Sequence, residues 1–219
     1  LAYRTVPFDA AFEMTARQSA ISDILEKFLI DFYVDRSRLL GVGIALPALI
    51  SGDHHRLDFA PTLGLKNISL DGITRNIPYP VHIENDGTAS GYAEGFLRRF
   101  DRNLAYFSLE YGVGGAVLPD GVLYLGDNAH AGEFGHLCVE PGGLPCTCGK
   151  NGCLEAYCSA RRIESTLGVS VPEFFAGVEK HIPEYEALLY DMLRHLGIAI
   201  NNVHMILDCD IVVGGILSE

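Results

Sequence analysis

The feature of this sequence that most constrains its fold is a tight cluster of cysteines. Three of the six cysteines, Cys146, Cys148 and Cys153, fall within the segment CTCGKNGC, where glycines occupy positions 149 and 152. Glycine permits tight backbone turns, so this spacing lets three sulfur atoms face a single point. Residues 146–153 are therefore predicted to form a compact loop rather than a helix or a strand.

Three thiolates leave one position open in the tetrahedral shell of a structural zinc ion. His136 precedes Cys146 by ten residues, and three cysteines with one histidine form a closed set of this kind. We predict Zn²⁺ bound by His136, Cys146, Cys148 and Cys153, with a structural role because no position remains for water. Cys138 is an alternative ligand, expected to point elsewhere because it closely follows His136. The competing interpretation is three buried or redox-active cysteines without a metal.

Charge and hydropathy restrict the classes of function. The formal net charge of -12 and the pI near 5.0 argue against sequence-independent binding to DNA or RNA, which relies on Lys and Arg at phosphates. We find neither an apolar run of about eighteen residues nor a cationic leader, so we expect a soluble, cytoplasmic protein that does not bind a membrane. The chain starts at Leu1 and ends just after an apolar run, so we expect a fragment.

Hydrophobic periodicity predicts alternating helices and strands. Apolar residues spaced by three and four predict helices over about 11–34, 87–97 and 186–207, and short apolar runs predict buried strands at 39–47, 81–84 and 210–215. Residues 104–126 predict two or three antiparallel strands, with a hairpin signal at Pro119-Asp120-Gly121. This alternation on both sides of a glycine-rich hairpin favours the α/β class.

Several segments together resemble the ROK family, which contains repressors, uncharacterised open reading frames and sugar kinases. They are GEFGH (132–136), CTCGKNGCLE (146–155), IEND (83–86), GVGIALP (41–47) and VVGG (212–215), in the same order along most of the chain. The resemblance implies an actin-like (ribonuclease H-like), two-lobed sugar-kinase fold, truncated at both ends. A partial N-terminal α/β lobe would span 1–85, and a C-terminal α/β lobe with the hairpin and a zinc loop (about 130–158) would span 86–219.

The resemblance also implies a sugar site. Asn85 and Asp86 would hydrogen-bond sugar hydroxyls, while Glu133, His136 and Glu155 would bind other hydroxyls of the same ring, with His136 shared between zinc and sugar. Amide, carboxylate and imidazole groups are those that a cleft uses to orient a pyranose. In a kinase Asp86 would act as general base. Without the resemblance, Asp86 is better explained as a helix cap, and the glutamates as surface carboxylates.

A kinase of this family also needs glycine-rich turns that hold the phosphates of ATP. Here the second turn is Glu110-Tyr111-Gly112-Val113-Gly114-Gly115, and Gly112, Gly114 and Gly115 would form a degenerate phosphate loop. A bulky ring replaces the family's Thr hydroxyl, and a carboxylate lies where polyphosphate would bind, which costs on the order of a kcal/mol. Further departures are Gly87-Thr88 for the kinases' Ala-Asn, and Thr62 and Leu65 for Asn and Trp.

These departures favour one of two hypotheses. The favoured one is the sugar-binding core of a ROK-type transcriptional regulator, a repressor of sugar-utilisation genes, with DNA bound only by a helix-turn-helix upstream of this segment. The alternative is an ATP-dependent kinase of hexoses or N-acetylhexosamines, which alone would need ATP and Mg²⁺. The resemblance implies a homo-oligomer, dimer or tetramer, in both cases. A zinc-stabilised module without a sugar ligand would leave Asn85, Asp86, Glu133 and Glu155 unexplained.

Overall fold

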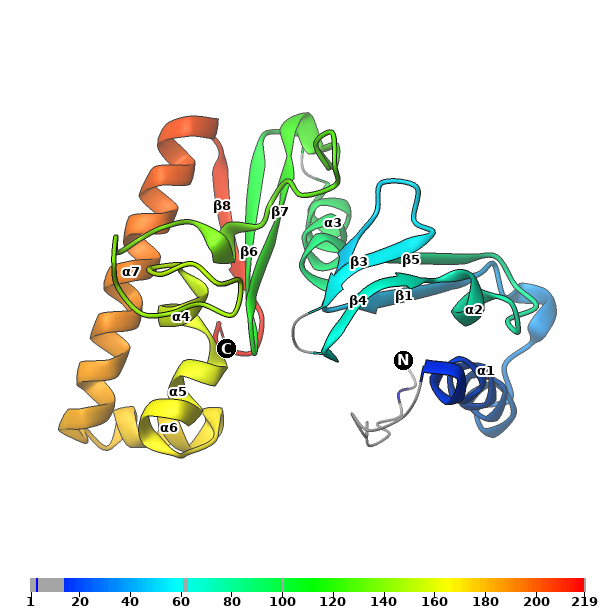
Figure 1. Cartoon of the computed structure of the whole chain (residues 1–219), viewed down its shortest axis with the longest axis horizontal. Helices are drawn as coiled ribbons and strands as arrows, with labels where there is room; N and C mark the ends of the chain where they lie inside the picture. The colour runs from blue at the N-terminus through cyan, green and yellow to red at the C-terminus, as the bar shows by residue number, and fades with distance from the viewer. Residues whose placement is uncertain (1–2, 4–13, 61–62, 100, 219) are drawn as a thin grey trace. The chain divides into compact units, whose positions relative to one another are not determined.

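The computed structural model describes residues 3, 14–60, 63–99 and 101–218 of the chain, so Thr62 and the start of the first predicted helix lie outside it. The chain divides into two compact units, Leu1–Asn85 and Asp86–Glu219. Helices and strands alternate in both, as the α/β class requires (Figure 1). None of the described helices combines the length and the apolar character needed to cross a bilayer.

The first unit contains two small sheets. Its elements are α1 (Met14–Asp31), the 3-10 helix η1 (Arg36–Arg38), β1 (Val42–Leu46), β2 (Leu49–Ile50), β3 (Arg56–Ala60), β4 (Leu65–Ser69), α2 (Asp71–Thr74) and β5 (Val81–Asn85). The strands β1 and β5 pair in parallel from Val42↔Val81 to Leu46↔Asn85. The order β2-β3-β4 forms an antiparallel sheet, which the sequence pattern did not predict because its strands are short.

The second unit is built on the sheet β7-β6-β8. Its elements are α3 (Asp86–Arg98), β6 (Leu104–Leu109), β7 (Val113–Leu118), η3 (Pro119–Gly121), η4 (Phe134–His136), α4 (Glu155–Cys158), α5 (Ala160–Leu167), α6 (Val171–Glu179), α7 (Pro183–Leu207) and β8 (Asp210–Gly214). Antiparallel β6 and β7 are joined by a hairpin that turns at 110–112. The predicted reversal at Pro119-Asp120-Gly121 is a 3-10 turn closed by the single antiparallel bridge Val117↔Tyr124, without a third strand.

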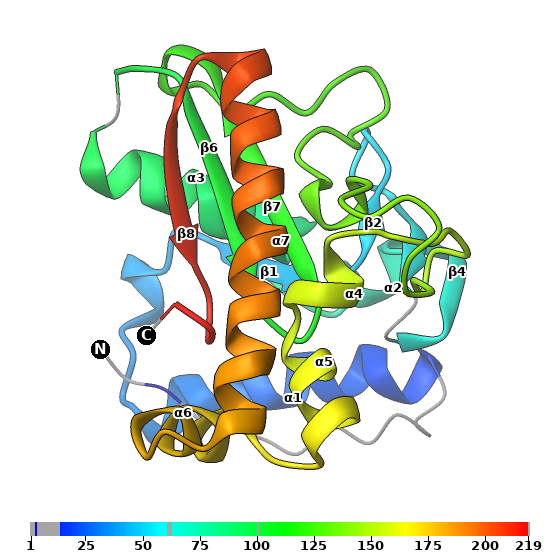
Figure 2. The same cartoon turned by 90° about the vertical axis from the view of Figure 1, so that its left-hand side faces the viewer.

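Strand β6 is buried on both faces, because helices cover the sheet on both sides (Figures 1 and 2). Ala105, Phe107 and Leu109 face the core shared with α7, where they meet side chains such as Leu188 and Val203. The alternate residues Leu104 and Tyr106 belong to a second cluster with Ala116 and Leu118 of β7. This alternation follows from the two-residue period of a strand, and each fully buried large side chain contributes roughly 1.5–3 kcal/mol.

Helix α3 approaches β7 closely because glycines line its inner face. Gly87, Gly91 and Gly95 recur every four residues and so share one face. A Cβ at Gly87 would lie 2.7 Å from the Gly115 nitrogen, one at Gly95 would lie 2.6 Å from Leu118 Cδ2, and one at Gly91 would overlap the Ala116 Cβ. This contact places Asp86, the first residue of α3, next to the start of β7.

Candidate functional site

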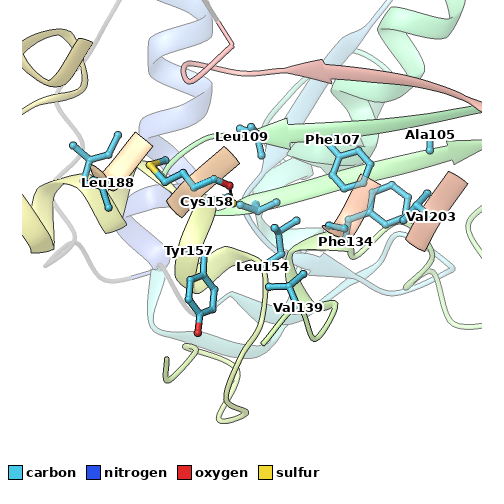
Figure 3. Close-up of a cluster of buried hydrophobic side chains, with 14 of the residues drawn as sticks. Ala105, Phe107, Leu109, Phe134, Val139, Leu154, Tyr157, Cys158, Leu188 and Val203 are labelled. Atoms are coloured by element: carbon cyan, nitrogen blue, oxygen red, sulfur yellow. Dashed lines mark hydrogen bonds between the residues drawn. The ribbon is translucent and has the colours of Figure 1, made fainter. Parts of the chain in front are cut away.

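The cysteine-rich loop is held in place by apolar side chains that enter the core on either side of its polar residues. Figure 3 shows Phe134, Val139, Leu154 and Tyr157 among the buried residues of this cluster. Phe134 stacks on Phe107 of β6 with ring centroids 4.6 Å apart. Because these anchors alternate with Glu133, His136, Cys153 and Glu155 along the chain, the core fixes where those polar residues emerge.

The structure brings the four predicted zinc ligands together. One ligand atom from each of His136, Cys146, Cys148 and Cys153 lies within 4.8 Å of all the others. The Nδ1 atom of His136 is 3.7 Å from Cys146 Sγ, and the sulfurs of Cys148 and Cys153 are also 3.7 Å apart. A tetrahedral ion with Zn–S bonds of about 2.3 Å needs sulfurs roughly 3.8 Å apart, so this geometry fits Zn²⁺.

The state of the thiols agrees with a cation at this point. All six cysteines are free, and the 3.7 Å separation of Cys148 and Cys153 is far beyond a disulfide bond. Burial, together with hydrogen bonds to Cys148 and Cys146, raises the pKa of Cys153 to about 12. Cys138, the alternative ligand, is exposed and lies outside the cluster.

Three carboxyl groups of the second unit interact near this loop. Burial, together with the negative charges of Asp86 and Glu155, raises the pKa of Glu133 to about 7. Burial also raises the pKa of Asp86, whose Oδ1 accepts a hydrogen bond of 2.9 Å from the Gly87 N–H in the first turn of α3. Asp86 therefore accepts a hydrogen bond within the first turn of α3. Together, the three carboxyl groups can exchange protons with a polar ligand.

Glu155 connects the cysteine-rich loop to the β6–β7 hairpin. Its Oε2 accepts a hydrogen bond of 3.1 Å from the Val113 N–H, and its Oε1 accepts one of 2.9 Å from the Thr147 hydroxyl. Arg161 Nη1 lies 3.8 Å from the same Oε1. Thr147 stands between two of the predicted zinc ligands, so Glu155 holds the metal loop as well as the hairpin. The sequence contained no signal for Thr147 beyond this position between cysteines.

Behind the loop, Tyr157 and His195 form a support that the sequence did not indicate. The Tyr157 hydroxyl accepts a hydrogen bond of 2.8 Å from the Leu144 N–H, and its ring stacks on His195 of α7 at 3.9 Å. His195 is 1% exposed, and its Nδ1 donates to the Asp191 carbonyl at 2.7 Å. The helical spacing of α7 places position 195 toward the core, which was the available signal.

Asn85 is the last residue of the first unit. Its side-chain amide donates to the Ala48 carbonyl at 3.1 Å, and its backbone N–H donates to Glu84 Oε1 at 2.8 Å. Leu65 begins β4 and packs on the core of the first unit, while Thr88 is buried in the first turn of α3. The structure thus groups Asp86, Glu133, His136 and Glu155 in one unit, whereas Asn85 belongs to the other.

Two glutamates, Glu155 and Glu164, contact the β6–β7 hairpin. The Tyr111 hydroxyl donates a hydrogen bond of 2.9 Å to Glu164 Oε1, and a Cβ at Gly112 would lie 2.8 Å from Glu155 Oε2. Gly115 packs against Phe134, whose Cδ2 would lie 2.6 Å from an added Cβ. The Val113 N–H, the type of group that cradles a phosphate, already donates to Glu155. These glycines therefore serve close packing inside the protein.

Comparison with known proteins agrees with this architecture. The ROK family model matches residues 10–219. A glucokinase from Halalkalibacterium halodurans is 34% identical over 175 residues, covering 78% of this chain and 51% of that protein. The xylose repressor of Bacillus subtilis is 32% identical over 149 residues, covering 66% of this chain and 38% of the repressor. The chain thus spans about half or less of the length of these relatives.

A solved structure extends the comparison to the fold. The crystal structure of a ROK family transcriptional regulator, described as a homologue of the E. coli MLC protein, superposes with a TM-score of 0.77 at 24% identity, covering 93% of this chain and 56% of the other. At that identity the match establishes the fold, which is the actin-like α/β fold that the sequence resemblance implied. The family match covers nearly the whole chain, which therefore belongs to the ROK family.

Proposed function

We propose that this chain is the sugar-binding effector core of a ROK-type transcriptional regulator and that a structural Zn²⁺ ion holds its sugar-binding loop. The observation that carries the proposal is the state of the hairpin at residues 110–115. Its Val113 N–H donates to Glu155, and its Tyr111 hydroxyl donates to Glu164. Because phosphate binding needs free N–H donors and a positive field, this turn is unsuited to the phosphates of ATP.

The same unit keeps, next to this hairpin, the groups to which we assign sugar binding. Asp86, Glu133 and Glu155 interact electrostatically, and His136 presents Nδ1 to the thiols. A carboxyl group with a pKa of about 7, such as that of Glu133, exists in both protonation states at neutral pH. It can therefore donate a hydrogen bond to a sugar hydroxyl or accept one from it. With His136 Nδ1 on the metal, Nε2 is the nitrogen left for a ligand, so zinc binding orients a sugar-binding group.

In a regulator, sugar acts by favouring one conformation over another. A ligand that binds two arrangements of lobes or subunits with different affinity shifts their populations by that difference. In the whole protein, which we propose to be a homo-oligomer, such a shift would change how two DNA-binding heads meet their half-sites. The net charge of -12 fits this division of labour, with DNA bound by a segment upstream of this one.

The second candidate is an ATP-dependent sugar kinase, and Asp86 favours it. Its carboxylate lies at the start of α3, and burial raises its pKa, as suits a general base for a sugar hydroxyl. The glucokinase relative adds weight, since its match covers more of the chain than that of the xylose repressor. In that case Asp86 would take the hydroxyl proton, and ATP with Mg²⁺ would supply the phosphoryl group.

A phosphorylation assay separates the two candidates. The intact protein, with Zn²⁺ bound, is incubated with Mg·ATP and a panel of hexoses, pentoses, amino sugars and N-acetylated sugars, while binding of each sugar is measured on the same sample. The regulator predicts binding of at least one sugar without turnover. Turnover of a bound sugar at roughly 1–100 s⁻¹, as is typical of kinases, would overturn the regulator proposal and establish a sugar kinase.

A further inference from the structure

A second group of metal-ligating side chains lies in the first unit, outside the site described above. One ligand atom from each of His54, His82 and Glu84 lies within 4.8 Å of the others. His54 belongs to the turn between β2 and β3, whereas His82 and Glu84 are two residues apart on β5 and so point to the same side of that strand. Segments that are distant in sequence therefore present two imidazoles and a carboxylate to one point.

The distances within this group do not fit direct hydrogen bonds. Glu84 Oε2 is 3.9 Å from His54 Nδ1 and 3.9 Å from His82 Nε2, beyond the range of a hydrogen bond. Ligands around a tetrahedral ion with bonds of about 2.0–2.2 Å lie roughly 3.3–3.6 Å apart, so His82 Nε2 and Glu84 Oε2 need only a small movement to share a metal. The ligand atom of His54 lies within 4.8 Å of both.

The partners of these side chains agree with metal binding. The Ile83 carbonyl lies 3.0 Å from His54 Nδ1 and can only accept, so this contact places the ring proton on Nδ1 and leaves the lone pair on Nε2. The Asn85 N–H donates to Glu84 Oε1 at 2.8 Å, which fixes the carboxylate and leaves Oε2 turned toward the imidazoles. Both contacts orient the first ligands as supporting hydrogen bonds do in metal sites.

The surroundings leave room for further ligands. His54 and His82 line a pocket of about 400 Å³ that also carries the carboxylates of Asp53 and Asp71. Three protein ligands leave at least one coordination position for water or for a small molecule. Imidazole and carboxylate donors suit Zn²⁺ and similar divalent transition metals such as Co²⁺ and Ni²⁺ rather than Mg²⁺.

We propose that His54, His82 and Glu84 form a second, solvent-open site for a divalent transition metal, separate from the zinc site of the cysteine-rich loop. A metal here would join the β2–β3 turn to β5, directly before Asn85. Because the site is open, its metal exchanges more readily than the enclosed one, which would make it a reversible binding site rather than a permanent structural one.

Cobalt distinguishes the two sites in the full-length protein. Co²⁺ is titrated into metal-free protein, the bound equivalents are counted by equilibrium dialysis, and thiolate-to-cobalt charge-transfer absorption marks Co²⁺ at cysteines. The quantity of interest is Co²⁺ that binds without adding thiolate absorption. We expect one such equivalent in the native chain and an affinity at least tenfold weaker in His82→Gln and Glu84→Gln.

His55→Gln is the matched control, because His55 lines the same pocket but pairs with Asp71 at 3.1 Å and lies outside the group. It should bind Co²⁺ like the native chain. His82 is well exposed, so its replacement leaves the fold intact, which circular dichroism verifies. The proposal would be overturned if the native chain bound no equivalent of Co²⁺ beyond the one that shows thiolate absorption. It would also be overturned if His82→Gln kept this additional equivalent at full affinity.

Discussion

The cysteine-rich loop and the β6–β7 hairpin lie against each other in the second unit, yet their polar groups are arranged for opposite purposes. In the loop, four metal-ligating side chains converge within 4.8 Å. In the hairpin, the Val113 N–H and the Tyr111 hydroxyl both donate to glutamates of the same chain. Possible metal ligands converge in one region, whereas the polar groups of the other are paired within the chain.

Glu155 links the two regions directly. The same carboxylate that the family resemblance assigns to the sugar also accepts the Val113 N–H of the hairpin and the Thr147 hydroxyl of the loop. Glu155 thus accepts the hydrogen bond of the Val113 N–H, which a phosphate would need as a donor. The proposed retention of sugar binding and loss of phosphate binding would therefore have a single structural origin.

The largest effect is expected from Cys148→Ser, which removes one proposed zinc ligand. Because the binding energy of a structural metal is also folding energy, we expect loss of the metal and a free energy of unfolding lower by about 3 kcal/mol or more. Sugar affinity should fall at least tenfold, since His136 is no longer fixed. Metal analysis, urea unfolding and calorimetry measure the three quantities.

Cys138→Ser is the control for this change, because Cys138 lies in the same loop but outside the cluster. It should keep metal, stability and sugar affinity. A Cys148→Ser protein that loses zinc yet binds sugar with native affinity would contradict the proposal that the metal supports sugar binding.

The scaffold shared by the loop and the hairpin can be tested at Gly91 of α3. Gly91→Ala would place a Cβ against the Ala116 Cβ and 3.1 Å from the Tyr106 Cβ, so we expect a loss of about 1–3 kcal/mol in urea unfolding. Gly197→Ala in α7 makes the same substitution where nothing lies within 4 Å, and it should stabilise by roughly 0.5–1 kcal/mol. Equal effects at the two positions would contradict the close packing of α3 on β7.

The buried carboxyl group of Glu133 predicts that the stability of the fold depends on pH. The pKa of Glu133 rises from 4.5 to about 7 in the folded chain, so its contribution to stability is present below pH 4.5 and is lost as pH rises through 7. Relative to the native chain, Glu133→Gln should gain about 2 kcal/mol of stability between pH 5 and pH 8.

Urea unfolding of both proteins across this range measures the difference, in which the titration of the zinc ligands cancels. Parallel stability profiles for the native chain and Glu133→Gln would show that Glu133 is not buried beside Asp86 and Glu155 as described.

The smallest effect is expected from restoring the hairpin. The double variant Glu110→Gly, Tyr111→Thr removes a carboxylate and supplies a hydroxyl, so Mg·ATP affinity should rise by about tenfold, equivalent to roughly 1.4 kcal/mol. Tyr111→Phe removes only the bond to Glu164, and it should change stability by less than about 1 kcal/mol without changing nucleotide affinity. Unchanged nucleotide affinity in the double variant would show that these two residues do not oppose ATP.

Local patterns predicted the long elements well. The periodicity over 186–207 indicated most of α7, and the apolar runs at 39–47 and 210–215 became β1 and β8, because burial imposes a clear pattern on such segments. The sheet β2-β3-β4 and helices α5 and α6 were missed, since short elements owe their structure to tertiary contacts. The glycine-rich stretch forms the β6–β7 hairpin at residues 110–112, whereas the turn at Pro119-Asp120-Gly121 is closed by one bridge and starts no third strand.

The candidate site shows the same division. The spacing of the cysteines predicted that His136, Cys146, Cys148 and Cys153 converge, as they do, because thiolate ligands need such spacing whatever the surrounding fold. The bonds of Glu155 to Val113 and Thr147 were invisible in the sequence, since they join segments whose approach depends on the folded core.

The central claim is that the chain retains a sugar site and has lost the phosphate site. The most direct test is calorimetric titration of one zinc-loaded sample of the intact protein, first with each sugar of the panel and then with a non-hydrolysable Mg·ATP analogue, with and without the best sugar. Binding of a sugar, with nucleotide binding far weaker than that of ordinary kinases and unchanged by the sugar, is the result we expect. Saturable binding of the analogue at ordinary kinase affinity, strengthened by sugar, would contradict the account.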